Sequence, residues 1–455
     1  MSIFRKAVLG APLCLALLSG LAAAHDLVFP PGEDARFHWA AYEAFAATHD
    51  LRGQHLSVDG PWGGIDKQMF ESVIAYFEAA TGAEVAYAGG DGFEQRLLVG
   101  VEAGAPPDVA IIPQPGLAAE LARRGHLAPL GAAIGAVMRD DYAAGQSWLD
   151  IATFAGPDGA PALYGLFYRV DLKSLVWYVP GNFTDAGYAV PRTFEELQAL
   201  SDRIVDEGGT PWCIGLGSGP ATGWPATDWV EEMMLRLHPP QDYDRWTRGA
   251  LPFDDPKVIA AIEGFGTIAR SAEQVVGGPE GVAATDFRDS PRGLFTLPPR
   301  CYMHRQASFI PSFFPAGLKP GRDFDAFYFP AFSAFSGRGQ PVLGSGTLAT
   351  ITRDSPAARG FLDFLATPIA HEIWMAQSGF LTPHRGVNHD LYGDPVQERL
   401  SEILLGATTF RFDGSDLMPG AIGAGAFWTG MIDYVGGASA KVVAARIRQV
   451  WDTLE

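Results

Sequence analysis

The apolar residues in the first third of the chain alternate between a strand-like and a helix-like spacing. A short strand is predicted at 54–58, and the helix after it places apolar residues at i, i+3, i+4 and i+7, namely Phe70, Val73, Ile74 and Phe77. Further strands are predicted at 84–87 and 108–112, with a helix from about residue 93 between them. This strand–helix–strand order indicates right-handed βαβ units, and therefore an α/β fold.

The first 24 residues have the pattern of a secretory signal peptide. Arg5 and Lys6 precede an apolar run over 7–21, and alanines at 22–24 offer a cleavage site before His25. The apolar run is short for a membrane span, and no later segment approaches that length. We therefore expect a protein exported to the periplasm, with 1–24 removed and no segment inserted in the membrane.

The composition describes a folded and acidic protein. Hydrophobic residues make up 47% of the 455 residues and charged residues 19%, which is typical of a globular chain. The 33 basic and 52 acidic side chains give a net charge of −19, and loss of Arg5 and Lys6 with the signal peptide lowers it by two. Such a surface argues against nucleic acid and anionic lipid as partners. The length favours two lobes over one core.

Two cysteines, Cys213 and Cys301, remain once the signal peptide is removed. Two thiols in an oxidising compartment are most simply read as one disulfide, and two separate buried thiols are the alternative. A metal site is not expected because neither cysteine has a partner at ligand spacing. No cofactor is expected.

Tryptophans gather beside turns in the middle of the chain. Pyranose rings pack their apolar faces on indole, while their hydroxyls need fixed donors and acceptors. Asp228 could bind such hydroxyls or cap a helix, and Gln114 and Gln306 could bind hydroxyls or tie loops together. The alternative for the tryptophans is the core, and Trp212 in particular could pack on a disulfide. The predicted carbohydrate-binding tryptophans are Trp177, Trp212, Trp224 and Trp229.

Several segments of the sequence resemble those of a known family. Residues 78–82, 103–109 (Ala-Gly-Ala-Pro-Pro-Asp-Val) and 114–116 resemble the N-terminal lobe of family-1 extracellular solute-binding proteins. Longer phrases are similar to one subgroup, the periplasmic α-glucoside-binding proteins of ABC importers. These phrases are 173–180 (Lys-Ser-Leu-Val-Trp-Tyr-Val-Pro), 210–215, 221–231, 306–314 and 412–420. The resemblance extends over essentially the whole chain after the signal peptide.

The resemblance implies a two-lobed periplasmic-binding-protein type II fold. Each lobe would be a mostly parallel sheet flanked by helices, with the ligand cleft between the lobes. The N-terminal lobe would comprise 25–168 plus 345–393, and the C-terminal lobe 169–344 plus 394–455. Such a protein, as a monomer, would capture an α-glucoside such as sucrose, maltose or trehalose and deliver it to the inner-membrane ABC permease subunits.

The same resemblance suggests further ligand-binding positions. Met303 to Phe309 matches the spacing of a Met-x-x-x-Gly-x-Trp phrase, with Phe309 in the aromatic place but Ala307 where glycine is usual. Trp428 lies in a phrase similar to another stacking segment of the family. Trp62 and Asp91 follow the first two strands, where proteins of this class meet their ligand. We read Asp413 as a turn residue or as an acceptor for a sugar hydroxyl.

A periplasmic glycoside hydrolase is the alternative to a binding protein. Its two carboxyl groups, about 5–10 Å apart, would have to come from Asp228, Glu231, Asp413 or Asp416. No Gly-x-Ser-x-Gly phrase, zinc-protease phrase or P-loop is present in the sequence. We therefore expect a binding protein and not an enzyme.

Overall fold

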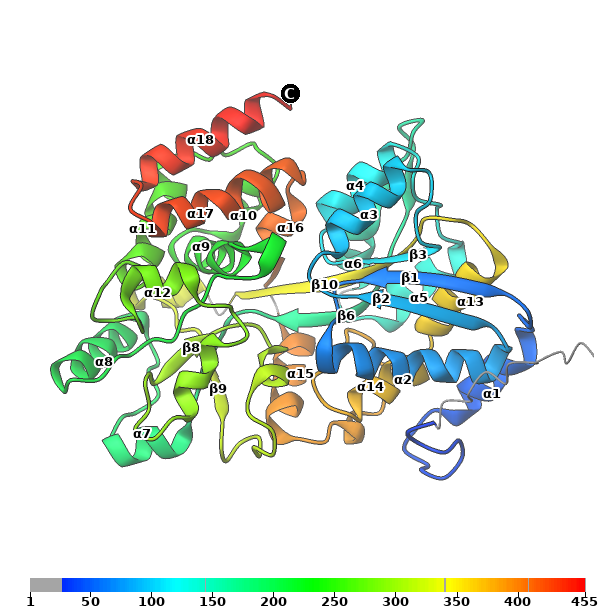
Figure 1. Ribbon diagram of the computed structural model, residues 1–455, viewed down its shortest axis with the longest axis horizontal. Helices are drawn as coiled ribbons and strands as arrows, with labels where there is room; N and C mark the ends of the chain where they lie inside the picture. The colour runs from blue at the N-terminus through cyan, green and yellow to red at the C-terminus, as the bar shows by residue number, and fades with distance from the viewer. Residues whose placement is uncertain (1–26, 144, 339–340, 408, 455) are drawn as a thin grey trace, which may run out of the picture.

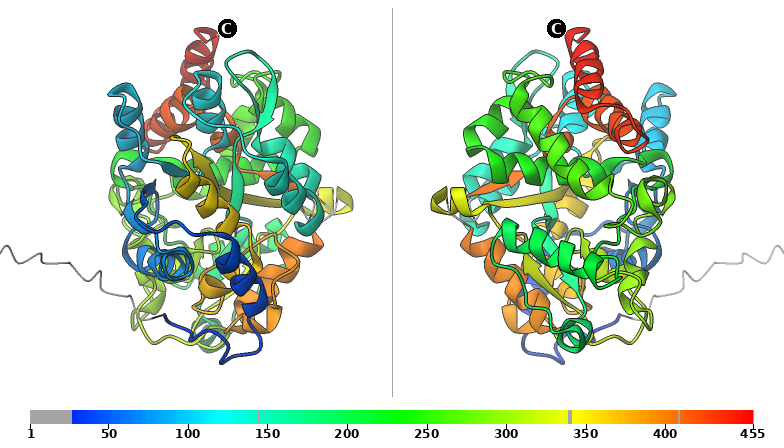
Figure 2. Two further views of the ribbon diagram at one scale, coloured as in Figure 1. Left: turned by 90° about the vertical axis from the view of Figure 1, so that its right-hand side faces the viewer. Right: turned by 90° about the vertical axis from the view of Figure 1, so that its left-hand side faces the viewer.

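The computed structural model describes residues 27–143, 145–338, 341–407 and 409–454. The predicted signal peptide over 1–24 lies outside the described residues. Within them, no helix is both long and apolar enough to cross a bilayer. The chain forms two lobes that lie side by side in Figure 1, with β6 and β10 running between them. The side views in Figure 2 show the C-terminal helix at one end of the molecule.

The first lobe, on the right in Figure 1, is built on a six-stranded mixed sheet of order β11-β10-β3-β1-β2, with β6 also paired to β10. β1 pairs in parallel with β2 and β3, and the strands predicted near these positions are confirmed. β10 runs antiparallel to β3 and β6. The strands are β1 (His55–Gly60), β2 (Glu84–Gly89), β3 (Val109–Ile112), β6 (Leu166–Leu172), β10 (Val342–Ile351) and β11 (Phe410–Phe412).

Helix α2 (Gly64–Thr81) confirms the predicted helix and shows why it forms here. Its apolar positions Phe70, Val73 and Phe77 are completely buried. The helix ends at Gly82, whose φ of 73° is left-handed and whose N–H donates to the carbonyl of Glu78. Glycine adopts this conformation without strain, so the Thr81-Gly82 stop is a local property of the sequence.

The remaining elements of the first lobe cover its sheet or its edges. The predicted helix near residue 93 is α3 (Phe93–Glu102), which joins β2 to β3. The other elements are α1 (Trp39–Thr48), α4 (Pro115–Arg123), α5 (Ala132–Asp141), α6 (Gly145–Ala152), β4 (Thr153–Ala155), β5 (Pro161–Leu163), α13 (Pro356–Leu365) and α14 (Pro368–Met375).

The second lobe has a different sheet from the one expected. Its three strands have the order β8-β7-β9, and both ladders are antiparallel, so the prediction of a mostly parallel sheet in each lobe is wrong here. Segment 211–217 does run parallel to its neighbours, but only through isolated bridges at Trp212 and Gly217. Pro211 has no amide hydrogen and glycines weaken a strand, so this segment does not form a regular ladder.

Helices make up most of the second lobe. α9 and α11 pack against each other at its centre, and the C-terminal helix α18 lies at its upper edge in Figure 1. The elements are β7 (Leu175–Tyr178), α7 (Pro180–Ala186), α8 (Phe194–Asp206), α9 (Trp224–Leu237), α10 (Pro240–Thr247), α11 (Pro256–Ala269), α12 (Gly278–Ala284), β8 (Met303–Arg305), β9 (Asp325–Tyr328), α17 (Trp428–Val435) and α18 (Ala440–Asp452).

The chain passes between the lobes through short extended segments. β6 of the first sheet ends at Leu172, and β7 of the second begins only three residues later at Leu175. A later connection runs through α15 (Pro395–Gly406), β11 and α16 (Gly414–Leu417). The predicted division into residues 25–168 plus 345–393 and 169–344 plus 394–455 stays a prediction.

The predicted disulfide is present in the second lobe. Cys213 and Cys301 are bonded, with their Cα atoms 5.5 Å apart and 88 residues apart in sequence. Both cysteines are buried, and the amide of Cys213 donates to the carbonyl of Met303. The bond therefore fixes β8 to the segment that leads into α9.

Removing this disulfide should destabilise the protein. For the Cys213→Ser and Cys301→Ser double variant, we expect the free energy of unfolding to fall by up to about 4–5 kcal/mol, because the unfolded chain regains the entropy of a long loop. Urea unfolding followed by far-UV circular dichroism measures the change. The wild type unfolded with a thiol reductant is the matched control and should approach the variant. Equal midpoints with and without the bond would contradict this prediction.

Candidate functional site

A cavity of about 480 Å³ lies between the two lobes. The first lobe lines it with the loops that follow β1, β2 and β3, which are the carboxyl ends of its parallel strands. Ligands of open α/β sheets bind outside these strand ends. The second lobe adds residues from the start of α9, from 287–288 and from α16. The volume is in the range of small-molecule sites.

Aromatic rings from both lobes line the cavity. Trp62 comes from the first lobe, and its indole packs 4.9 Å from that of Trp374 and 4.6 Å from the ring of Phe70. Trp224 of the second lobe packs 4.9 Å from Phe287 in an edge-to-face contact. The aromatic lining residues are Trp62, Phe93, Trp224, Phe287, Phe309, Phe313 and Trp428.

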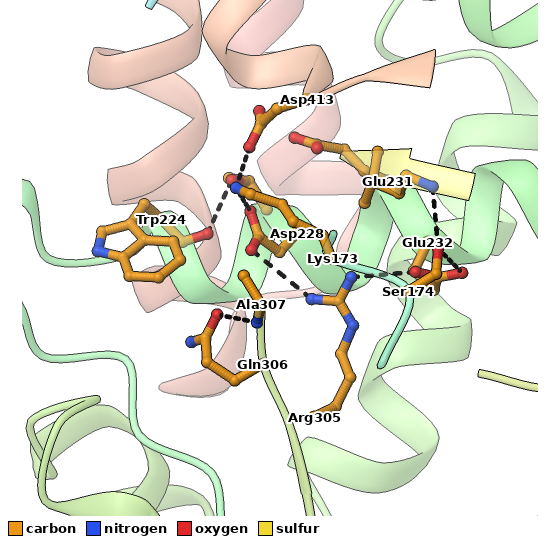
Figure 3. Close-up of polar contacts among 12 residues, drawn as sticks. Lys173, Ser174, Trp224, Asp228, Glu231, Glu232, Arg305, Gln306, Ala307 and Asp413 are labelled. Atoms are coloured by element: carbon orange, nitrogen blue, oxygen red, sulfur yellow. Dashed lines mark hydrogen bonds and ion pairs between the residues drawn. The ribbon is translucent and has the colours of Figure 1, made fainter. Parts of the chain in front are cut away.

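A buried lysine lies at the base of the cavity. Lys173 follows β6 at the passage between the lobes, and its Nζ donates to Oδ1 of Asp228 at 2.8 Å and to Asp413. Figure 3 shows the ammonium between these two carboxylates. The same Nζ lies 5.3 Å from the centre of the Trp224 ring. Lys173 therefore links β6, α9 and the turn before α16 beside an aromatic wall.

The carboxylates around Lys173 are themselves bound to further groups. Asp413 accepts hydrogen bonds from the hydroxyl of Ser415 at 2.8 Å and from the amide of Asp416 at 3.0 Å. The amide of Ser415 also donates to Glu231 at 2.9 Å. All of these groups are buried. The arrangement makes α16 a rigid part of the cavity wall.

Charge extends from this group into the second lobe. Arg305 lies between Asp228 and Glu232, with nitrogen–oxygen distances of 3.7 Å and 3.1 Å (Figure 3). Glu232 also pairs with Arg236 and accepts from the hydroxyl of Ser174. Buried charges are costly unless they are paired. Here Lys173 and Arg305 each lie between two acidic side chains, and Arg236 pairs with Glu232.

Burial and charge set the protonation of this cluster. Burial raises the pKa of Asp228 to about 7, although Lys173 opposes the shift. Burial, reinforced by the charge of Asp413, raises the pKa values of Glu231 and Asp416 well above their usual range. Burial would also raise the pKa of Asp413, but contact with Lys173 lowers it. Asp413 therefore carries the charge that neutralises the ammonium.

A second buried cation lies on the first-lobe side of the cavity. Arg169 in β6 donates to Asp66 of α2 at 2.8 Å, and its guanidinium lies 4.9 Å from the Trp374 ring. Asp171 lies 3.8 Å from Arg169 and accepts from the hydroxyl of Ser308. Arg169 and Asp66 both line the cavity, so its charges are paired on this side also.

Some buried polar atoms of the lining have no hydrogen-bond partner among the described residues. They are Oε1 of Gln114, Nη2 of Arg169 and Nε1 of Trp428. A buried polar atom without a partner costs about 1–3 kcal/mol. All three atoms belong to residues that line the cavity.

Three carboxylates of the acidic cluster lie close enough together to hold a metal ion. One carboxylate oxygen each of Asp228, Glu231 and Asp413 lies within 4.8 Å of the others, a spacing that an ion could use. The Lys173 ammonium already binds two of these carboxylates. It supplies the positive charge that an ion would bring, so we assign no metal to this cluster.

The cavity brings together seven of the twelve predicted ligand-binding residues. They include Trp62 in the loop after β1, Phe309 at the family-like aromatic position, and Asp413 in the turn before α16. Their direct role in binding stays a prediction. The seven residues are Trp62, Asp91, Gln114, Trp224, Phe309, Asp413 and Trp428.

The other five predicted residues do not line the cavity. The indole N–H groups of Trp177 and Trp212 are bound within the core, to the carbonyl of Gln306 and the hydroxyl of Ser201. Trp229 packs edge-to-face on Trp212 at 5.4 Å. All three are buried core residues, because protein groups bind the N–H of Trp177 and Trp212 and pack on the ring of Trp229.

The two polar residues in that group also have internal roles. The side-chain oxygen of Gln306 accepts from the amide of Ala307, so it ties its own loop. Asp228 is held by Lys173 inside α9, whose N-cap is Gly223, so Asp228 is neither the predicted cap nor a lining residue.

The sequence did not predict several charged lining residues, chiefly Arg169, Lys173 and Arg288, and it offered Asp416 only as a carboxylate of the glycoside hydrolase alternative. Arg169 and Lys173 lie in or beside β6, whose seven residues are all buried. Two basic residues in an otherwise buried strand region are a signal, because charges are rarely buried unless they are paired. Lys173 is the first residue of segment 173–180, whose sequence resembles the α-glucoside-binding subgroup but does not by itself indicate a buried charge.

Two lobes around a lined cleft, with paired charges and aromatic walls, define a binding protein for a small ligand. Residues 64–372 match the family model described as bacterial extracellular solute-binding protein. The match spans more than half of the 455 residues, so the chain belongs to this family. Membership of a solute-binding family decides against the glycoside hydrolase alternative. It also confirms the predicted class of fold.

Two relatives are similar over most of their length. The chain is 58% identical to the alpha-glucosides-binding periplasmic protein AglE of Rhizobium meliloti, over 99% of this chain and 100% of that protein. It is 42% identical to the osmoprotective compounds-binding protein GgtB of Synechocystis sp., over 88% of this chain and 92% of that protein.

Solved structures share the fold. A chitin oligosaccharide binding protein superposes with a TM-score of 0.73 at 18% identity, covering 88% of this chain and 98% of that one. The GacH receptor of Streptomyces glaucescens superposes with a TM-score of 0.68 at 15% identity, covering 89% and 99% of the two chains. At this identity the likeness supports the two-lobed fold alone.

The raised pKa of Asp228 predicts that stability falls as pH rises. The pKa of an aspartate in the unfolded chain is about 4, whereas the pKa of Asp228 in the folded protein is raised to about 7. The contribution is therefore full below about pH 4 and is lost as pH rises through 7, with a limiting slope of about 1.4 kcal/mol per pH unit for one proton.

We expect Asp228→Asn to lower this slope by the share of one proton, because asparagine does not titrate, while Glu231 and Asp416 still contribute through their own raised pKa values. Thermal unfolding from pH 5 to pH 8 measures the slope for each protein. Asp289→Asn, at an exposed aspartate of the same lobe, is the matched control and should keep the slope of the wild type. A variant with the same slope as the wild type would contradict the assignment.

Proposed function

We propose that this protein binds α-glucosides in the cleft between its lobes and delivers them to the permease subunits of an ABC importer. The observation that carries the proposal is the combination of aromatic walls with paired, buried polar groups in one interlobe cavity. Its similarity to a protein named for α-glucosides supports the choice of ligand class. Periplasmic export through residues 1–24 is part of the same proposal.

The cavity chemistry suits a neutral ligand with many hydroxyls. Lys173 is paired with Asp228 and Asp413, and Arg169 with Asp66, so these cations have no need of an anionic ligand. Hydroxyl groups can donate to these carboxylates and accept from the cations without adding charge. Trp224 and Trp428 offer indole rings to the apolar face of a pyranose.

The lobes are in direct contact beside the cavity, and we take this arrangement as the closed form of the proposal. Gly116, at the start of α4 in the first lobe, packs against the carbonyl of Met418 in the second. A ligand held between the lobes favours this closed form because only then do both walls contact it. The permease subunits would recognise the closed form.

The proposal is tested by calorimetric titration with sucrose, maltose, trehalose and glucose. We expect saturable one-to-one binding of a disaccharide at micromolar or tighter affinity, with no glucose released in the same samples. Release of glucose would identify a glycoside hydrolase. Failure to bind any of the four sugars would contradict the α-glucoside assignment while leaving the family membership intact.

Trp428→Leu should weaken disaccharide binding by about tenfold or more, since it removes an indole ring from the cavity lining. Trp451→Leu is the matched control: its side chain is 9% exposed against 6% for Trp428, in the same lobe, and it does not line the cavity. Equal loss of affinity in both variants would mean that Trp428 acts only through stability.

Gly116→Ala should prevent full closure. A Cβ atom at this position would lie 1.9 Å from the Met418 carbonyl oxygen in the closed form. We expect affinity to fall by about tenfold or more and compaction on adding sugar, measured by small-angle X-ray scattering, to be reduced. Gly131→Ala, where a Cβ meets no atom within 4 Å, is the control. Normal closure of Gly116→Ala would show that the two lobes approach differently in solution.

A further inference from the structure

An ion pair bridges the two lobes at the rim of the cavity. Asp91 lies in the loop between β2 and α3 of the first lobe, and Arg288 follows α12 in the second. Nη2 of Arg288 lies 2.6 Å from Oδ2 of Asp91. Both residues line the cavity. This contact therefore joins the lobes directly, beside the space that the ligand would fill.

Arg288 is held in place by its own lobe. Its Nη1 lies 3.0 Å from Oδ2 of Asp286, and its amide donates to the same carboxylate at 2.9 Å. The guanidinium also lies 4.6 Å from the Phe287 ring. These contacts are all within the second lobe and do not depend on closure. The arginine is thus oriented towards the cleft, and the Asp91 contact alone is lost when the lobes separate.

The loop that carries Asp91 also lies near the second lobe. A Cβ atom on Gly219, in the loop before α9, would lie 3.9 Å from the Cβ of Asp91. The Asp91 side chain is 48% exposed and that of Arg288 is 26% exposed. The pair is therefore shielded from solvent on one side but remains within reach of salt.

We propose that Asp91 and Arg288 form a latch that holds part of the ligand-free protein in the closed form and slows ligand release. The first effect needs no ligand, and the second rests on the proposed function. A partly exposed ion pair changes a two-state ratio by about two- to fivefold, and dissolved salt weakens it. The latch thus sets how readily the cleft opens.

The latch is tested first on the ligand-free protein by small-angle X-ray scattering at about 0.02 M and about 0.5 M sodium chloride. We expect the wild type to expand at high salt. Asp91→Asn and Arg288→Gln should be expanded at low salt already and respond little to salt. The double variant should match either single variant, because the two residues act through one contact.

Arg292→Gln is the matched control, since Arg292 pairs with Asp289 within the same lobe and both side chains are more than half exposed. It should behave as the wild type does. If Asp91→Asn and Arg288→Gln scatter as the control does at both salt concentrations, the latch is overturned. If the effects of the two variants add in the double variant, the residues act separately and the pair is overturned.

The second arm measures release of maltose by stopped-flow tryptophan fluorescence. Both single variants should release it about two- to fivefold faster than the control does. An unchanged release rate, with altered scattering of the ligand-free protein, would overturn the slow-release part and keep the first. Absence of binding of sucrose, maltose, trehalose and glucose alike would count against the proposed function and not against the scattering result.

Discussion

The pairing of one buried ammonium with the carboxyl groups around it is the interaction on which the site depends. Lys173 binds Asp228 of α9 and Asp413 before α16, at the place where the chain leaves β6 for β7. Removing one partner of such a group leaves an uncompensated charge in the interior, which is far more costly than losing an exposed pair. The junction between the lobes and the base of the cavity are therefore held by the same contacts.

This arrangement also decides what kind of ligand the cleft can accept. The buried cations along the cavity are paired within the protein, so neither an anion nor a cation is needed to complete the charge balance. The lining instead leaves neutral hydrogen-bonding capacity at Gln114 and Trp428, between aromatic rings. Shape and hydroxyl placement, not net charge, are what such a cleft can discriminate.

Local sequence patterns predict the framework better than the site. The helix with Phe70, Val73 and Phe77 is decided by its own spacing and by Gly82, and both are visible in the chain. Tryptophan is different, because an indole fits a core as well as a sugar, and only tertiary packing distinguishes Trp224 from Trp229. The role of Lys173 depends on partners 55 and 240 residues away, which no local pattern contains.

The two strands that run between the lobes meet the cavity at an irregular point of their ladder. β6 and β10 pair antiparallel, and their register shifts between Gly346 and Leu348. Gly346 and Thr347 line the cavity beside that shift. An irregular ladder bends more easily than a regular one, and here it lies on the cleft floor. Opening and closing of the cleft would therefore change the backbone next to the ligand, which couples lobe movement to occupancy without a separate signalling element.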